Sequence, residues 1–214
     1  TTREGRISAR KDSSITQNLK VFGGVSFPIG VFGSTSDPEG GYARTGFSIG
    51  LQISSFGKFF ELGLTAILVN HSLDGSPKPK RFTRTVRDTT VVTLGQWGLL
   101  WGMVHLGLHT SISPAVSLYA QGLFGVAGAF GPEFTYYNGI YHDHIDQTPA
   151  TFGYGVGAGV IIDDKLQVGL VVLNCNPEYE VPPDVEGSAK PKFRQPISTI
   201  QLTIGYIWRF HLNR

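Results

Sequence analysis

Apolar residues alternate with small or polar residues along most of the chain, from residue 17 to residue 210. The pattern is clearest at 199–210, where the even positions are Ile200, Leu202, Ile204, Tyr206, Trp208 and Phe210. Residues two apart share a face of a β-strand, so this segment predicts a strand with one apolar face and one mostly polar or small face. Residues 151–162 repeat the pattern, with four glycines on the second face: Gly153, Gly155, Gly157 and Gly159.

Six further segments follow the same rule, which brings the expected number of strands to eight. They are residues 19–31, 44–54, 60–68, 100–109, 116–127 and 166–172. Their connections alternate in length. Short turns are expected at 56–58, 113–114 and 163–165, and long polar loops at about 33–43, 73–91, 131–149 and 176–196. Strict alternation of short and long connections predicts an all-β, eight-stranded antiparallel up-and-down transmembrane β-barrel.

The alternation allows two opposite orientations of the strands. In a soluble barrel the apolar face points inward, whereas in a membrane barrel it points outward to lipid around a small, polar lumen. The row of glycines would build almost no core, and the charges gather in the loops and the first residues. Both features favour the membrane orientation. We therefore expect a flexible periplasmic leader over 1–16, a barrel over 17–210 and a short tail over 211–214.

Composition excludes several classes of protein. Only 16% of the 214 residues are charged and the formal net charge is +2, which argues against a nucleic-acid binder with its concentrated basic face. Cys175 is the single cysteine, so an internal disulfide and a zinc site with several cysteines are both excluded.

Three segments resemble a known family. The last strand, IQLTIGYIWRF, and the runs FGGVSFPIGVFG and GGYARTGFSIGLQI are similar to the small eight-stranded bacterial outer-membrane β-barrel proteins, over about residues 17–210. The resemblance implies a bacterial outer membrane, extracellular long loops, periplasmic termini and contact with outer-membrane lipid and glycolipid. It also implies that the barrel-assembly machinery reads Tyr206, Trp208 and Phe210 as its signal. Here Phe210 is followed by residues 211–214, a departure from the family pattern.

The interior is expected to hold few ionisable side chains. They are Lys20, Arg44, Glu61, His105, His109 and Arg209. Lys20, Glu61, His109 and Arg209 fall near the periplasmic end. A buried carboxylate is costly without partners, so Glu61 should pair with one or more of these cations. Such a cluster is either part of an ion path or a plug, and the narrow lumen of an eight-stranded barrel favours the plug.

Three sets of loop residues are candidates for binding. The basic side chains Lys78, Lys80, Arg81 and Arg84 suit glycolipid phosphates or an acidic partner. The aromatic side chains Tyr136, Tyr137 and Tyr141 suit sugars or a protein partner, or pack on the barrel rim. The third set consists of weak metal-ligand candidates: His142, Asp143, His144 and Asp146. A solvated loop is the default for the basic and metal-ligand sets, and we expect no metal and no cofactor.

Some small outer-membrane barrels modify lipid A, which requires a serine nucleophile and a histidine base. The side chains of His71 and Ser72 should diverge on a strand, and His109 and Ser111 lie beside a short turn, far from outer-leaflet lipid. We therefore expect no catalytic residues. The sequence predicts a small non-enzymatic barrel with a structural or interaction role, as a subunit or accessory of a larger envelope complex. A transport or ligand-binding barrel and a lipid A-modifying hydrolase or acyltransferase remain the alternatives.

Overall fold

The computed structural model describes residues 15–35, 40–57, 59–74, 90–94, 96–131, 133–137, 142–145, 148–180 and 192–212. Their elements are β1 (Ile15–Pro28), the 3-10 helix η1 (Gly30–Gly33), β2 (Ala43–Phe56), β3 (Phe60–Leu73), β4 (Thr90–Leu94), β5 (Gln96–Ser113), β6 (Val116–Phe130), β7 (Glu133–Tyr137), β8 (His142–Ile145), β9 (Ala150–Ile162), β10 (Leu166–Cys175), β11 (Glu178–Glu180), β12 (Lys192–Arg194) and β13 (Ile197–Leu212). Within these ranges, no helix has the length and apolar character needed to cross a membrane.

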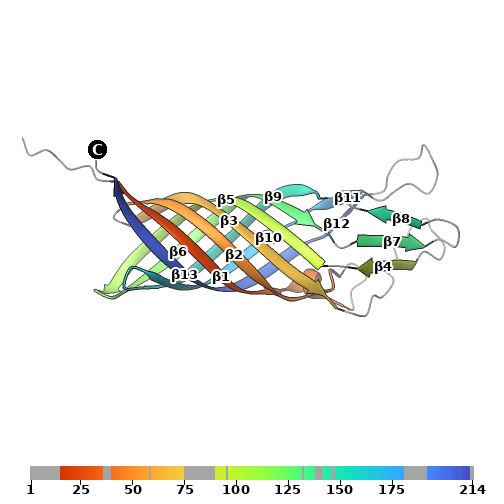
Figure 1. The fold of residues 1–214 in the computed structure, drawn as a ribbon, viewed down its shortest axis with the longest axis horizontal. Coiled ribbons are helices and arrows are strands. Elements are labelled where there is room, and N and C mark those ends of the chain that lie inside the picture. Colours follow the sequence, from red (N-terminus) through yellow and green to blue (C-terminus); the bar gives the residue numbers. More distant parts are fainter. Residues whose placement is uncertain are drawn as a thin grey trace, which may run out of the picture.

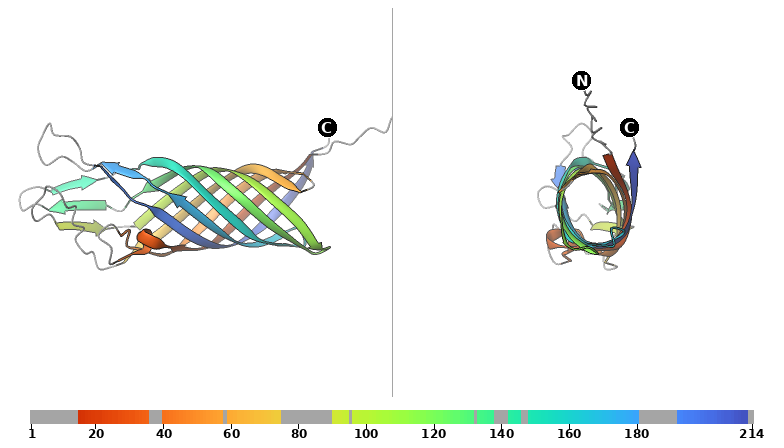
Figure 2. Two further views of the ribbon diagram at one scale, coloured as in Figure 1. Left: turned by 180° about the vertical axis from the view of Figure 1, so that it is seen from behind. Right: turned by 90° about the vertical axis from the view of Figure 1, so that its left-hand side faces the viewer.

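Eight of these strands form a closed barrel, as the sequence predicts. Their order around the wall is β1-β13-β10-β9-β6-β5-β3-β2, and every neighbouring pair is antiparallel. Figure 2 shows the closed wall end-on. β1 begins two residues before the expected start of the barrel and β13 ends two residues after its expected end. β1 ends at Pro28, earlier than expected, since proline lacks the backbone N–H that continued pairing needs.

The two ends of the barrel differ in their connections. Short links at 57–59, 114–115 and 163–165 define what we call the turn end, where β13 also finishes. The opposite loop end carries a three-stranded sheet, β4-β7-β8, and a two-stranded sheet, β11-β12, beyond the barrel wall (Figure 1). The sequence predicts the alternation of lengths correctly. It does not predict these five short strands, because the long connections were expected to be loops.

One short link shows how the turn end is built. Asp163 and Asp164 both have positive φ, at 49° and 57°, and Lys165 N donates to Ile162 O over 3.1 Å. This is a two-residue type I′ turn, whose twist matches that of the two flanking strands. Aspartate tolerates the left-handed region better than most residues, so the local sequence fits a tight β9–β10 hairpin.

The apolar face of the barrel strands points outward, as expected. On β13, Leu202, Ile204 and Tyr206 are exposed, whereas Gln201 and Thr203 are buried. The same alternation continues around the wall: Leu64 and Phe152, on other strands, keep 66% and 65% of their surface exposed. An exposed apolar surface that encircles the whole molecule far exceeds the patches that soluble monomers carry. The exterior therefore suits lipid rather than water.

The interior is filled with side chains, and the row of glycines on β9 makes room for them. A Cβ on Gly153 would lie 2.6 Å from the Trp101 ring, and one on Gly159 would lie 2.8 Å from the Tyr119 ring. The expectation of a small, polar lumen is correct near the turn end and wrong near the loop end. There the buried residues are mostly large and apolar: Ile67, Val69, Trp97, Leu99, Trp101, Leu123, Leu173 and Ile197. An eight-stranded barrel is narrow enough for side chains to fill it, and in this half the filling side chains are apolar.

Because the apolar face points outward, a charged side chain on it should destabilise the barrel, and by more at the bilayer midplane than near the interfaces. Leu202 lies in the middle of β13, beside Val25 of β1 and Leu170 of β10, and is 49% exposed. Leu202→Arg should lower the free energy of unfolding in lipid by about 2–4 kcal/mol, because it places a cation at the bilayer midplane. Urea titration in phospholipid vesicles measures this change.

A matched control is the same substitution at the turn end. Leu166 begins β10 and also faces outward, so Leu166→Arg should cost only about 0–1 kcal/mol near the interface. Equal costs at the two positions would contradict the placement of the wall in the bilayer.

Candidate functional site

The polar half of the interior is organised around His105 of β5, which is fully buried. Gln52 Nε2 donates to His105 Nε2 over 2.6 Å. On the other side of the ring, His105 Nδ1 lies 2.9 Å from Thr65 Oγ1, within hydrogen-bonding distance. His105 thus links β2, β3 and β5 through the interior. Sequence reasoning placed this histidine inside the barrel but gave it no role.

Glu61 of β3 adjoins this network through Ser54 and His105. Its carboxylate accepts a hydrogen bond from Ser54 and lies 3.9 Å from His105 Nε2. Lys20 of β1 is 5% exposed, and its ammonium interacts with the charge of Glu61 at a longer range than that of an ion pair. The ammonium also lies 5.8 Å from the centroid of the Tyr119 ring. This interaction has the sign that the expected pairing of Glu61 with a lumen cation requires, and the pairing itself stays a prediction.

Arg209, which the sequence groups with Lys20 and Glu61, has a different ionic partner. Its two terminal nitrogens contact the two carboxylate oxygens of Asp164 over 2.9 Å and 3.0 Å. Asp164 belongs to the type I′ turn, and this turn lies against the end of β13, where Ile207 N donates to Lys165 O. Sequence reasoning missed Asp164 because it considered only residues on strands. His109 lies half-buried on the lumen face, opposite Tyr119 of β6.

Lys20, Glu61 and Arg209 meet around one small cavity near the turn end. Its polar lining residues are Asn18, Lys20, Glu61, Tyr119, Gln167 and Arg209. The cavity holds about 10 Å³, which is roughly the space that one water molecule needs. The arrangement therefore neutralises buried charge, and the cavity has no room for a solute.

A second polar contact lies higher in the barrel, between Ser26 of β1 and His71 of β3. Ser26 Oγ lies 3.2 Å from His71 Nε2, and His71 Nδ1 donates to the Arg44 carbonyl over 2.7 Å. Gly46 lies between them in the wall, where a Cβ would come within 2.9 Å of His71 Nδ1. A serine bonded to a histidine is the arrangement of a nucleophile and its base. Here both side chains are fully buried, so the contact is structural.

Ser72 points outward while His71 points inward, as the sequence predicts for neighbouring residues on a strand. Ser111, the other serine considered as a nucleophile, is exposed at the turn end and bonds to Ser117 Oγ over 3.1 Å. Thus neither Ser72 with His71 nor Ser111 with His109 forms the hydrogen-bonded pair that a nucleophile and its base require.

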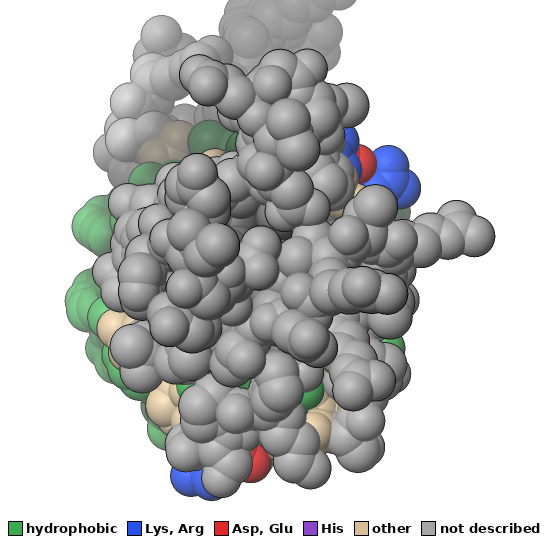
Figure 3. All heavy atoms as spheres, turned by 90° about the vertical axis from the view of Figure 1, so that its right-hand side faces the viewer, with side chains coloured by type: hydrophobic (Ala, Val, Ile, Leu, Met, Phe, Trp, Pro, Cys, Tyr) green, Lys and Arg blue, Asp and Glu red, His purple; other side chains and the backbone are tan. Residues whose placement is uncertain are grey.

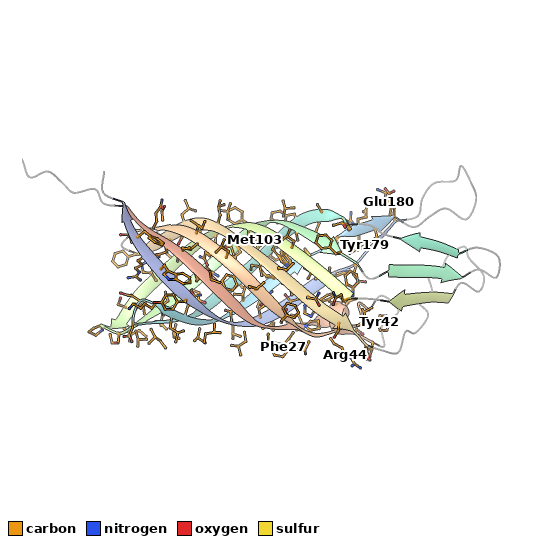
Figure 4. The ribbon with its side chains drawn as sticks, viewed as in Figure 1. Phe27, Tyr42, Arg44, Met103, Tyr179 and Glu180 are labelled. Atoms are coloured by element: carbon orange, nitrogen blue, oxygen red, sulfur yellow. The ribbon has the colours of Figure 1, made fainter. Side chains whose placement is uncertain are left out.

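Three aromatic rings close the loop end, and we call them the aromatic plug: Phe32 of η1, Trp97 of β5 and Tyr179 of β11. Each is at most 1% exposed. Trp97 packs edge-on against both other rings, with centroids 5.6 Å and 6.2 Å away, and donates to the Gly41 carbonyl over 2.8 Å. Figure 4 labels Tyr179 at this end and the buried Met103 further toward the turn end.

Arg44 is not inside the barrel, contrary to expectation. A β-bulge between Ala43 and Gly46 shifts the alternation by one residue, so Ala43 points inward and Arg44 outward. The Arg44 guanidinium donates to the Asp74 carboxylate at the rim, and its side chain remains 59% exposed. No motif in the sequence marks the bulge. The prediction from the two-residue alternation, that Arg44 lies inside the barrel, is therefore wrong.

Most of the loop candidates lie outside the described residues. These are Lys78, Lys80, Arg81, Arg84, Tyr141 and Asp146. The backbone places Tyr136 and Tyr137 on β7, paired with Asp143 and His142 of β8, and His144 two residues further along β8. Over the ranges that the structure covers, no group of three metal-ligating side chains comes together.

The β11-β12 hairpin at the loop end carries its own ionic contacts. Glu178 accepts hydrogen bonds from Lys192 Nζ over 3.0 Å and from Arg194 Nε over 3.2 Å. These bonds lower the pKa of Glu178, and the same contact raises the pKa of Lys192. Such exposed pairs fix the register of the hairpin more than they stabilise it.

Lys20 and Arg209, the two cations near the turn end, should couple differently to Glu61. Glu61→Gln should destabilise the barrel because it leaves Lys20 without its carboxylate, by up to about 3–5 kcal/mol for a fully buried pair. Adding Lys20→Met should recover part of this loss, since contacting partners do not add independently. Double-mutant cycles from urea unfolding in vesicles measure both effects.

The matched control is Arg209→Gln, which removes a cation held by Asp164. Its coupling to Glu61→Gln should be smaller than that of Lys20→Met, because Asp164 already neutralises Arg209. If Glu61 is coupled to Arg209 rather than to Lys20, the assignment of partners is wrong.

Comparison with known proteins adds information on architecture alone. No family model and no curated sequence matches the chain significantly. Among solved structures, neisserial surface protein A is similar with 12% identity and a TM-score of 0.48, covering 92% of this chain and 97% of that one. The attachment invasion locus protein Ail of Yersinia pestis has 14% identity and a TM-score of 0.44, with coverages of 91% and 99%. OprG of Pseudomonas aeruginosa has 14% identity and a TM-score of 0.44, with coverages of 92% and 97%. Such identities transfer no activity or ligand, and the chain resembles these small outer-membrane β-barrels in fold.

Proposed function

We propose that this protein is a closed outer-membrane barrel that anchors an interaction surface and catalyses no reaction. Its role is structural: it holds the β-structure of its loop end in place for another component of the envelope. The observation that carries this proposal is the interior, which side chains fill from the turn end to the loop end.

The exterior supports the location. Large apolar side chains cover the wall, and the described charges Arg44, Asp74, Arg209 and Asp164 lie at its two edges. Figure 3, which looks onto the loop end, has apolar side chains along the side of the barrel and charged ones at its edge. An apolar band between polar rims is the pattern of an outer-membrane barrel, which carries short periplasmic turns and longer extracellular connections. In this orientation the loop end is extracellular.

Three successive layers support a closed interior. Nearest the turn end is the layer of Lys20, Glu61 and His105. Trp101 and Met103 fill the middle of the barrel, and the aromatic plug covers the loop end. An eight-stranded barrel is just wide enough for side chains to fill it. A transport role would need a path through all three layers, so the geometry favours the structural role.

The sheets beyond the wall support an interaction role. In the β4-β7-β8 sheet, the two outer strands each pair on one side only within the described residues. Edge strands offer backbone donors and acceptors to which an extended segment of another protein adds as a further strand. The loop end thus presents a surface suited to a protein partner.

A closed interior predicts no steady conductance. The purified protein in planar bilayers should give no stable single-channel current. Phe32→Ala should also give none, because it removes one ring of the aromatic plug and leaves the Lys20–Glu61–His105 layer in place. Stable, reproducible currents from the unaltered protein would contradict the proposal.

The interaction role predicts a partner that depends on the loop end. Purification from the native outer membrane in mild detergent should yield a stoichiometric second protein. Replacing residues 131–149, which include β7 and β8, with a short turn should release this partner while the barrel keeps its heat-modifiable gel migration. Replacing residues 181–191 in the same way is the control and should retain it. Absence of any partner, or retention by both variants, would oppose the role assigned to this sheet.

A further inference from the structure

The wall of the barrel has a groove on its outer surface, where β1 and β2 separate. Their pairing ends at Ser26 and Gly46, although β1 continues to Pro28 beside β13 and β2 begins at Ala43 beside β3. Two causes act together: Pro28 has no N–H to offer, and the bulge between Ala43 and Gly46 bends β2. The strands therefore part at the loop end.

The groove has a volume of about 470 Å³ and opens on the side of the barrel. Its apolar lining comes from Phe27, Pro28 and Ala43, and its polar lining from Arg44, Thr45 and Ser72. Phe27 is 42% exposed and belongs to the outward face of β1, which continues down the wall into the apolar exterior. The groove is thus continuous with the surface that faces lipid.

A cation stands at the edge of this groove. The bulge turns Arg44 outward, where its side chain is 59% exposed. Figure 4 shows Phe27 and Arg44 on the same side of the barrel near the loop end. The Asp74 carboxylate accepts a hydrogen bond from one terminal nitrogen of Arg44, and this bond orients the guanidinium. A guanidinium has five donors, so one carboxylate contact leaves donors to bind an anion bidentately.

We propose that this groove binds one molecule of a phosphorylated glycolipid of the outer leaflet, with an acyl chain against Phe27 and Pro28 and a phosphate on Arg44. The assignment rests on the proposed function, because the groove reaches that leaflet only if the loop end is extracellular. A groove with an apolar side at Phe27 and Pro28 and a guanidinium at its edge matches an amphiphile with an anionic head. The lipid-facing position of the groove favours such a molecule over a soluble anion.

Native mass spectrometry of the detergent-purified protein tests this proposal with purified lipid A as the probe. The unaltered protein should retain one copy. Arg44→Gln should weaken retention about tenfold, which is the scale of one hydrogen bond to a charged group. Arg44→Lys should weaken it less, and Asp74→Asn should strengthen it by removing the competing carboxylate. Ser72→Trp should block the groove without changing any charge.

Two controls separate the possible results. Arg194→Gln removes an exposed cation from β12, away from the groove, and should leave retention unchanged. Dephosphorylated lipid A and a zwitterionic diacyl phospholipid should both be retained more weakly than lipid A. Equal retention of all three lipids, or equal retention by Arg44→Gln and Arg194→Gln, overturns the assignment.

The same preparations distinguish failure of this site from failure of the proposed function. Every variant should require detergent and keep heat-modifiable migration, as a folded membrane barrel does. A barrel that folds in detergent but does not respond to Arg44→Gln refutes the lipid site alone. Recovery of the unaltered protein as a soluble monomer without detergent refutes both.

Discussion

The pairing of β1 with β13 is the contact on which the rest of the structure depends. It runs without interruption from Ile15 opposite Leu212 to Pro28 opposite Thr199, and it turns a sheet with two open edges into a closed wall. Lipid offers no hydrogen bonds, so a sheet can cross a membrane only when its edges are joined in this way. Closure also divides every strand into a face for lipid and a face for the interior.

The small circumference then determines what the interior can do. Eight strands leave space for side chains and little else, so each large ring inside needs a small residue opposite: Trp101 lies over Gly153, and Tyr119 over Gly159. Charge in this space must be paired. Glu61 therefore lies near Lys20 and His105, and Arg209, nearer the rim, is held by Asp164. The filled interior leaves the rim, the wall and the sheets at the loop end as the surfaces available for function.

The sequence predicts the strands and their faces because the two-residue period follows from covalent geometry alone, and the residues on β13 show it without interruption. It misplaces Arg44, because a bulge shifts the period and no residue type announces it. It also misses the Ser26–His71 contact and the aromatic plug. These contacts join residues far apart in the chain, and Phe32 comes from a short 3-10 helix in a connection without any period. Local patterns thus determine the wall, while tertiary packing determines the contents of the barrel.

The central claim is that the apolar face meets lipid and the opposite face lines an interior filled with side chains. Nitroxide labels at single cysteines along residues 200–208 of β13, in a chain with Cys175 replaced by serine, test it most directly. In vesicles, the accessibility of the label to oxygen should be high at even positions and low at odd positions, and a water-soluble nickel complex should reach neither set near the midplane. The opposite phase, or strong contact with the nickel complex at odd positions, would contradict the account.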